Sequence, residues 1–300
     1  MINGIINVYK EKGYTSHDVV AKMRGILKMK KIGHTGTLDP DAQGVLPVCV
    51  GKATKLVEMI TDKDKTYEAV CKLGITTDTQ DITGKVLTTT EVIVNFEQIE
   101  EVIKSYIGEY LQLPPMYSAI KVDGKKLYEL ARQGIEIDRE RRKVIIKDIR
   151  ILDYSKEDNE VKVSVDCGKG TYIRTLLHDI GETLGCGGTM KSLIRTAVGN
   201  FKVAEALKLS EIEELVRVDG LDPFIVTVDQ IFEVYSKLTV DREYHKLIYN
   251  GNSFCKEHLA EPVNEVTTEL IRVHDADDVF IGIYRYDVED GRYKPVKMFL

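Results

Sequence analysis

The sequence lacks the features of a membrane-spanning or disulfide-built protein. No apolar run reaches the roughly 18 residues that span a bilayer. The N-terminus, MINGIINVYKEKG, has no basic region followed by a long apolar stretch, so we expect no signal peptide. The cysteines are odd in number, scattered, and form no Cys-x-x-Cys pair, which favours reduced thiols in a cytoplasmic protein. They are Cys49, Cys71, Cys167, Cys186 and Cys255.

The sequence also lacks the signatures of cofactor-dependent chemistry. It contains no glycine-rich dinucleotide fingerprint. Histidines and cysteines are not grouped at metal-ligand spacing, and the Cys255/His258 pair alone is too small a donor set. We therefore expect no cofactor and no metal.

What is present is the composition of a globular protein with a full-sized core. Of 300 residues, 43% are hydrophobic and 30% are charged. This length allows one large domain or two smaller ones. A net charge of −6 and a pI near 5.7 argue against a general nucleic-acid binder. Charge acts locally, however, because the Debye length is about 8 Å at physiological salt.

Two segments are basic in spite of the negative net charge. Residues 19–38 contain five Lys or Arg residues and no acid, and residues 121–147 contain nine against five acids. Each segment is either a solvated surface or a contact surface for nucleic acid, and charge alone does not decide between these interpretations.

The hydrophobic pattern predicts an α+β fold, because helices and strands occur without regular alternation. Apolar residues recur at helical spacing over 17–28, 96–107 and 173–184. Period-two or β-rich patterns predict strands over 67–73, 144–152 and 161–167. Glycines and prolines predict a loop over 33–47. A boundary near 229–238 would leave a small C-terminal β domain.

The most informative stretch is GHTGTLDPDAQGVLPVCVGKATK (33–55), which contains one acid, Asp39, between glycines and Pro40. Taken alone, Leu-Asp-Pro is more typical of an Asx turn than of a catalytic site. A phosphatase-type aspartate motif would need an apolar strand before the acid, and here a glycine-rich stretch precedes it. A P-loop would need a glycine where Leu46 stands.

Four segments in order resemble the TruB-type tRNA pseudouridine synthases. The 33–55 stretch resembles the catalytic motif, and KTYEAVCKLGITTDTQDITG (65–84) the second segment. PPMYSAIKVDGKKLYELARQGIE (114–136) resembles the RNA-clasping insertion, and CGKGTYIRTLLHDIGETLGCGG (167–188) the Tyr/Arg segment. The resemblance covers roughly residues 1–200. It implies a pseudouridine-synthase fold: a mixed, mainly antiparallel sheet flanked by helices, with an RNA-clasping insertion and a small C-terminal PUA-like β domain.

The resemblance implies a reaction that breaks the C1′–N1 bond of a uridine, rotates the uracil and forms a C1′–C5 bond. Asp39 matches the catalytic nucleophile. Arg174 matches the arginine that pairs with this carboxylate. Tyr67 matches the tyrosine that stacks on the flipped base and serves the proton transfer. The atom that Asp39 attacks stays open.

Further positions follow from the same resemblance. Tyr172 and Leu193 match pocket residues, and His34 matches a histidine that fills the space beside the flipped nucleotide. Two positions depart from the family pattern: Glu11 replaces a usual proline and Gln43 a usual threonine, which could alter loop stiffness. The candidate RNA contacts are Lys10, Lys12, Lys30, Lys31, Lys125, Lys126 and Arg132.

The implied substrate is the T arm of tRNA, modified at position 55, by a monomer without an obligate protein partner. The implied domains are a catalytic unit (1–235) with an RNA-binding insertion (117–145), and a small C-terminal unit (236–300). This last unit holds nine basic and twelve acidic residues, so we expect weak phosphate binding there. A synthase acting on another RNA and a non-catalytic tRNA-binding or tRNA-folding protein remain alternatives.

Overall fold

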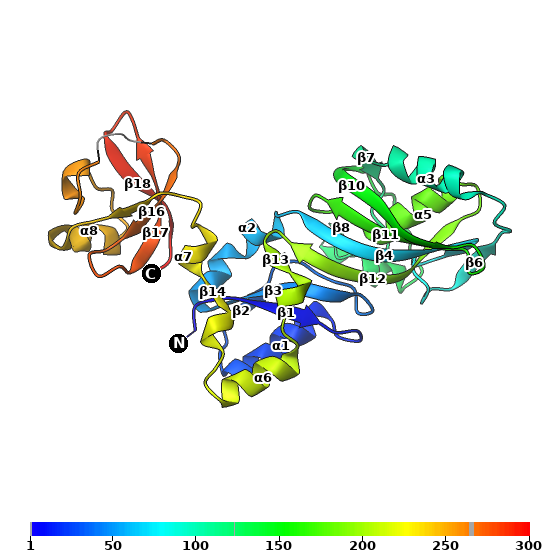
Figure 1. Ribbon diagram of the computed structural model, residues 1–300, viewed down its shortest axis with the longest axis horizontal. Coiled ribbons are helices and arrows are strands. Elements are labelled where there is room, and N and C mark those ends of the chain that lie inside the picture. The colour runs from blue at the N-terminus through cyan, green and yellow to red at the C-terminus, as the bar shows by residue number, and fades with distance from the viewer. Residues whose placement is uncertain (1, 123, 264–266) are drawn as a thin grey trace.

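The computed structural model describes residues 2–122, 124–263 and 267–300, and its central feature is a long mixed sheet flanked by helices (Figure 1). In hydrogen-bonding order its strands are β14 (Ile225–Thr227), β1 (Gly4–Lys10), β3 (Gln43–Val50), β12 (Gly188–Val198), β4 (Lys65–Leu73), β11 (Glu160–Cys167), β10 (Arg142–Ser155) and β7 (Gly108–Gln112). β2 (Ile32–His34) adds to β3, and β13 (Phe201–Lys202) adds to β12. All pairings are antiparallel except that of β12 with β3, so the expected α+β fold is confirmed.

The three predicted amphipathic helices are confirmed within two residues at each end. They are α1 (Ser16–Leu27), α3 (Phe96–Ser105) and α5 (Ile173–Thr183). Thr15 and Asn95 cap the first two through their side chains, which satisfies backbone N–H groups that have no partner within the helix. α1 ends at Lys28, whose backbone is left-handed at φ 52°.

The half of the sheet around β1 and β3 is buried on both faces. Ile6 and Val48 pack against α1 and α6 (Leu209–Arg217), whereas Ile5 and Cys49 face the opposite core. A strand buried on both sides shows no alternation of apolar and polar residues. The prediction of a loop over 33–47 was therefore wrong at both ends. Residues 33–34 belong to β2 and residues 43–47 to β3, so the loop itself spans 35–42.

The other half of the sheet buries one face under α5 and α3. Along β4, Tyr67, Ala69 and Cys71 point into this core, while the residues between them are half-buried. This alternation is the period of two that predicted the strand. The alternation places Tyr67 on the face of the sheet that α5 covers, and Arg174 is the second residue of α5.

The C-terminal residues form a second sheet of β15 (Lys237–Thr239), β16 (Leu270–His274), β17 (Phe280–Asp287) and β18 (Arg292–Met298), with its own apolar core. Phe232 stacks near Phe280 and Phe299, which joins this sheet to the end of the long sheet. The remaining elements are short: η1 (Gly51–Leu56), α2 (Val57–Thr61), β5 (Ile75–Thr77), β6 (Val86–Thr89), β8 (Lys121–Val122), β9 (Lys125–Lys126), α4 (Leu127–Ala131), η2 (Val203–Glu205), η3 (Asp222–Phe224), α7 (Val228–Ile231), η4 (Arg242–Tyr244), α8 (His245–Tyr249) and η5 (Lys256–His258).

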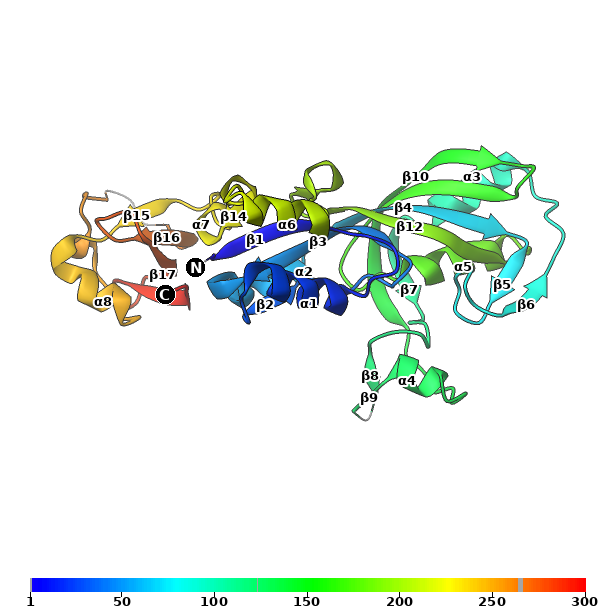
Figure 2. The same cartoon turned by 90° about the horizontal axis from the view of Figure 1, so that it is seen from below.

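The segment made of β8, β9 and α4 projects away from the long sheet, as Figure 2 shows. Within the described residues, no helix is both long enough and apolar enough to span a membrane.

Gly44 is needed where β3 meets β12. Its φ is +105°, and a Cβ there would lie 2.2 Å from the Arg195 carbonyl oxygen. Gly185 has a similar φ of +75° but open space around it.

We expect Gly185→Ala to lower the free energy of unfolding by about 1 kcal/mol, the cost of the left-handed backbone alone. Gly44→Ala should cost distinctly more in urea denaturation, because the two strands must separate; equal losses would contradict this view of the junction.

Candidate active site

Asp39 lies in the loop between β2 and β3, and the neighbouring backbone holds that loop in place. The Leu38 N–H donates to the Ser16 hydroxyl at 2.9 Å, and the Gly13 N–H donates to the Pro40 carbonyl at 2.9 Å. The loop is thereby tied both to the start of α1 and to the turn before it. Asp39 keeps 40% of its side chain exposed, so its carboxylate is accessible to a ligand.

Lys10 holds the same loop through hydrogen bonds to its backbone. Its ammonium donates to the carbonyls of Pro40 at 3.0 Å and Ala42 at 2.6 Å, and the residue is fully buried. Burial lowers the pKa of Lys10 to about 8. This burial does not fit the expected contact of Lys10 with RNA, because its charged group faces the Asp39 loop rather than solvent.

Arg174 pairs with Asp39 through two guanidinium nitrogens. Nε lies 2.9 Å from Oδ2, and Nη2 lies 3.3 Å from Oδ1. Nη2 also donates to the Tyr117 carbonyl at 2.8 Å, and Nη1 donates to the Thr79 carbonyl at 3.0 Å. Nη1 also forms an ion pair with Asp81, whose Oδ2 is 3.7 Å away. The arginine, which is 5% exposed, thus combines three hydrogen bonds with ion pairs to two carboxylates.

Asp81 is a part of the site that the sequence interpretation missed. It lies in the turn between β5 and β6, where its Oδ1 accepts from the Thr83 N–H at 3.0 Å. This leaves Oδ2 directed at Arg174. The quoted segment 65–84 contained Asp81, but nothing in its local pattern distinguished it from Asp78 in the same turn.

The electrostatics of Asp39 combine opposing effects. Burial raises the pKa of its carboxyl above the ordinary value, Arg174 acts in the opposite direction, and Asp81 raises it again. Arg174, and to a smaller extent Lys10, therefore favour the ionised carboxylate, which is the form able to act as a nucleophile.

Tyr67 and Leu193 enter the site from neighbouring strands. Both belong to one apolar cluster with Leu38, the residue before Asp39, and they are 8% and 7% exposed. Burial raises the pKa of Tyr67, Arg195 lowers it, and Asp39 raises it. Tyr67 is thus a neutral phenol close to the carboxylate, and its mainly buried ring forms one wall of the site.

Tyr172 and His34 lie at the edges of this region. Tyr172 immediately precedes α5, and its backbone exchanges two hydrogen bonds with the buried Gln112 amide at 2.8 and 2.9 Å. His34 accepts from the Gly36 N–H at 3.3 Å and stacks edge-on with His17 at a centroid distance of 5.2 Å. Burial lowers the pKa of His34, which favours its neutral form.

The other candidate RNA contacts remain at the surface. Lys12, Lys30 and Lys31 are exposed near the N-terminal part of the site, and Lys12 pairs with Asp41 at 3.7 Å. Lys125, Lys126 and Arg132 lie on the projecting segment. Its Tyr128 ring has the charges of Lys126 and Arg132 each 5.4 Å from its centroid.

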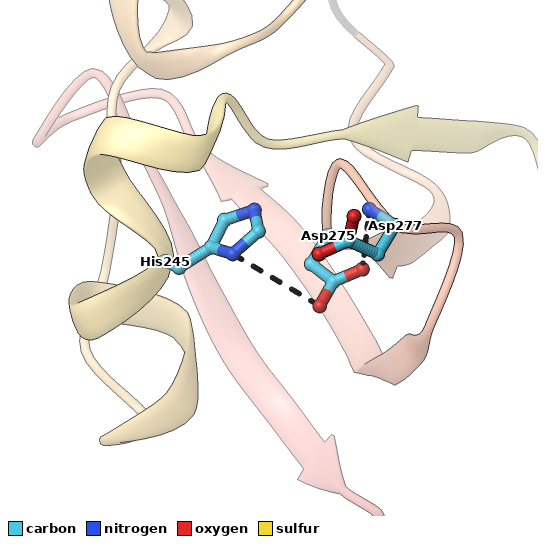
Figure 3. A group of neighbouring side chains, drawn as sticks. All are labelled: His245, Asp275 and Asp277. Atoms are coloured by element: carbon cyan, nitrogen blue, oxygen red, sulfur yellow. Dashed lines mark hydrogen bonds and ion pairs between the residues drawn. The ribbon is translucent and has the colours of Figure 1, made fainter.

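A second grouping of titratable side chains lies in the C-terminal sheet, where His245, Asp275 and Asp277 come together (Figure 3). His245 accepts from the Ala276 N–H at 2.9 Å through Nε2, and its Nδ1 lies 4.0 Å from Asp275. Asp275 also accepts from the Tyr249 hydroxyl at 2.8 Å. These contacts fasten the turn after β16 to α8, which gives the cluster a structural role.

Comparison with known proteins agrees with this architecture. Residues 24–173 match the model of the TruB family pseudouridylate synthase N-terminal domain, and residues 174–233 match the tRNA pseudouridylate synthase B C-terminal domain. A protein of Lachnoclostridium phytofermentans named tRNA pseudouridine synthase B is 54% identical over the whole of both chains. One of Alkaliphilus oremlandii with the same name is 46% identical over 97% of this chain and 96% of that protein.

Solved structures are similar to this chain over nearly its whole length. A Cbf5-Nop10-Gar1 complex aligns with a TM-score of 0.71 at 27% identity, covering 99% of this chain and 85% of that one. An H/ACA RNP bound to a substrate RNA aligns with a TM-score of 0.70 at 25% identity, covering 99% and 85%. The fold and its matches define a pseudouridine synthase, an enzyme that isomerises uridine. Within that class, the chain belongs to the TruB family.

The contact of Asp81 with Arg174 predicts a catalytic effect. Asp81→Asn keeps the Oδ1 acceptor for Thr83 but removes the charge that faces Nη1. We expect the single-turnover rate of pseudouridine formation to fall about tenfold or more, or at least 1.4 kcal/mol. Asp78→Asn is the matched control, since the Asp78 side chain accepts from the Lys85 N–H in the same turn, at 2.8 Å. Equal effects of the two variants would show that Asp81 acts through the turn alone.

Proposed function

We propose that this protein converts the uridine at position 55, in the T loop of tRNA, into pseudouridine. The observation that carries the proposal is the buried Arg174 holding the accessible carboxylate of Asp39 beside Tyr67. The tRNA substrate is supported by the name of relatives that match this chain along its full length at 54% and 46% identity.

In this proposal, Asp39 is the nucleophile and Arg174 fixes its direction. A guanidinium bound at both carboxylate oxygens leaves little freedom of rotation, so the carboxylate is oriented before the substrate arrives. Tyr67 stacks on the flipped uracil and accepts the C5 proton. Stacking of about 1–3 kcal/mol offsets part of the unstacking cost. Neutral His34 fills the space that the base leaves, and Tyr172 and Leu193 line the pocket.

The proposal assigns the catalytic unit to residues 1–235 and the RNA-binding insertion to residues 117–145, with residues 236–300 as a small PUA-like unit. The enzyme acts in the cytoplasm as a monomer, without a cofactor or an obligate protein partner. Support for independent action comes from the relatives named as single enzymes that align end to end. The aligned ribonucleoprotein chains, in contrast, are longer than this one.

A direct test uses the purified protein and an unmodified tRNA transcript, with nothing else added. We expect pseudouridine at position 55, located by mass spectrometry. Asp39→Asn should abolish turnover while leaving tRNA affinity within about tenfold, or 1.4 kcal/mol. Asp41→Asn is the matched control, because this neighbouring acid is exposed and pairs with the exposed Lys12. Modification at another site would favour a different RNA substrate, and no product from a folded transcript would contradict the proposed enzyme.

The insertion should contribute phosphate contacts. Replacing Lys125 and Arg132 by alanine removes two exposed cations of the projecting segment. We expect weaker tRNA binding and a slope of log affinity against log salt that is shallower by about 0.7–0.9 for each cation that no longer binds a phosphate. Lys104→Ala is the control: this exposed residue on α3 pairs with Glu100 at 2.9 Å. An unchanged slope would remove the segment from the binding surface.

A further inference from the structure

Arg195 is a buried cation to which the proposed reaction gives no role. It lies on β12 and is 1% exposed. Its Nε donates to the Val45 carbonyl at 2.7 Å, and its Nη2 donates to the Gly36 carbonyl at 3.3 Å. Within residues 2–122, 124–263 and 267–300, no carboxylate forms an ion pair with it. Burying an unpaired charge costs several kcal/mol, so this arrangement requires a compensating group or a function.

The side chain directly opposite Arg195 is Tyr67. The register of β12 on β4 pairs the two residues, and such opposite side chains have Cβ atoms about 4.5–5.5 Å apart. Both side chains therefore extend from the same face of the sheet, and the Arg195 guanidinium lowers the pKa of the Tyr67 hydroxyl. A β-bulge between Arg195 and Ala197 interrupts the strand at this point. Bulges commonly redirect a side chain next to an active site.

Arg195 differs from the other charged groups near this hydroxyl. Burial, Cys167 and Asp39 all raise the pKa of Tyr67, and Arg195 opposes them. The ammonium groups of Lys10 and Lys65, also buried, are held by backbone carbonyls. Tyr67 therefore begins as a neutral phenol, and the cation at the opposite position of the neighbouring strand favours its anion.

We propose that Arg195 is a positioning residue that stabilises the Tyr67 phenolate while Tyr67 moves a proton from C5 to N1 of the substrate base. This inference rests on the proposed function. When the C1′–N1 bond breaks, its electron pair stays with the base, and the Tyr67 hydroxyl gives its proton to N1. After the C1′–C5 bond forms, the phenolate takes the C5 proton, and the C5–H electron pair restores the ring double bond.

This sequence of steps balances without another proton carrier. Tyr67 ends the turnover as the phenol with which it began, and the base has exchanged a hydrogen on C5 for one on N1. Any bond or proton that Asp39 takes up is returned in the same turnover. The anion exists only between the two transfers, which is the interval in which a neighbouring guanidinium lowers its energy.

A purely structural role predicts different behaviour. As a clamp, Arg195 would join the Asp39 loop to β3 through Gly36 and Val45, and its loss would lower stability and slow every step alike. Loss of phenolate stabilisation slows the steps in which Tyr67 carries negative charge, and cleavage of the C5–H bond is one of these. An isotope at C5 therefore separates the two roles.

The test measures single-turnover pseudouridine formation by the full chain on tRNA transcripts with hydrogen or deuterium at C5. R195Q should reduce the rate about 100-fold, the scale of general acid–base catalysis, with tRNA affinity within about threefold. Deuterium at C5 should slow R195Q markedly more than wild type. R195K, which keeps the charge, should recover much of the rate and restore the wild-type isotope effect.

Thermal unfolding is measured in parallel, and Lys65→Met is the matched control. Lys65 is 7% exposed and held by the carbonyls of Thr61 and Lys63, so its loss should lower stability without changing the isotope effect. A wild-type isotope effect in R195Q would overturn the role of Arg195; should R195Q not fold, a loss of rate of about 100-fold in folded R195K with the wild-type isotope effect would overturn it, because R195K keeps the charge. An inactive wild type would instead count against the proposed function itself.

Discussion

The guanidinium of Arg174 is the constraint on which the site depends. Its hydrogen bonds and ion pairs reach the Asp39 loop, the turn that holds Asp81, and the backbone at Thr79 and Tyr117. A buried donor left without a partner costs about 1–3 kcal/mol, so these segments hold one another in place. Tyr117 lies just before β8, where the projecting segment begins. Arg174, which pairs with the Asp39 carboxylate, therefore also binds the backbone next to that segment.

The cations around the site have different partners and, for that reason, different functions. Arg174 faces carboxylates and acts on the charge of Asp39. Lys10 donates hydrogen bonds to backbone carbonyls of the loop, so it helps to fix the path of the chain. Arg195 combines carbonyl partners with a phenol, which is the basis for assigning it to proton transfer as well as to the clamp. The roles assigned to these three buried cations therefore follow from the groups that each one contacts.

The long sheet explains why some predictions from the sequence were confirmed and others were wrong. β4 buries one face, so its residues alternate and the strand was predictable. β3 is buried on both faces and begins with Gln43 and Gly44, and its turn-like composition concealed a central strand. Lys10 was assigned to the surface for a similar reason, because nothing in a local sequence tells whether a lysine meets solvent or a ring of carbonyls.

The sequence by itself determined the α+β class, the three amphipathic helices, the family resemblance and the candidates Asp39, Tyr67 and Arg174. These follow from local periodicity and from ordered motifs, which need no knowledge of contacts. Only the tertiary structure decided that Arg174 is buried between Asp39 and Asp81, and that Arg195 lies opposite Tyr67. The physical reason is that burial and pairing are properties of contacts between residues far apart in the chain, such as Asp39 and Arg174.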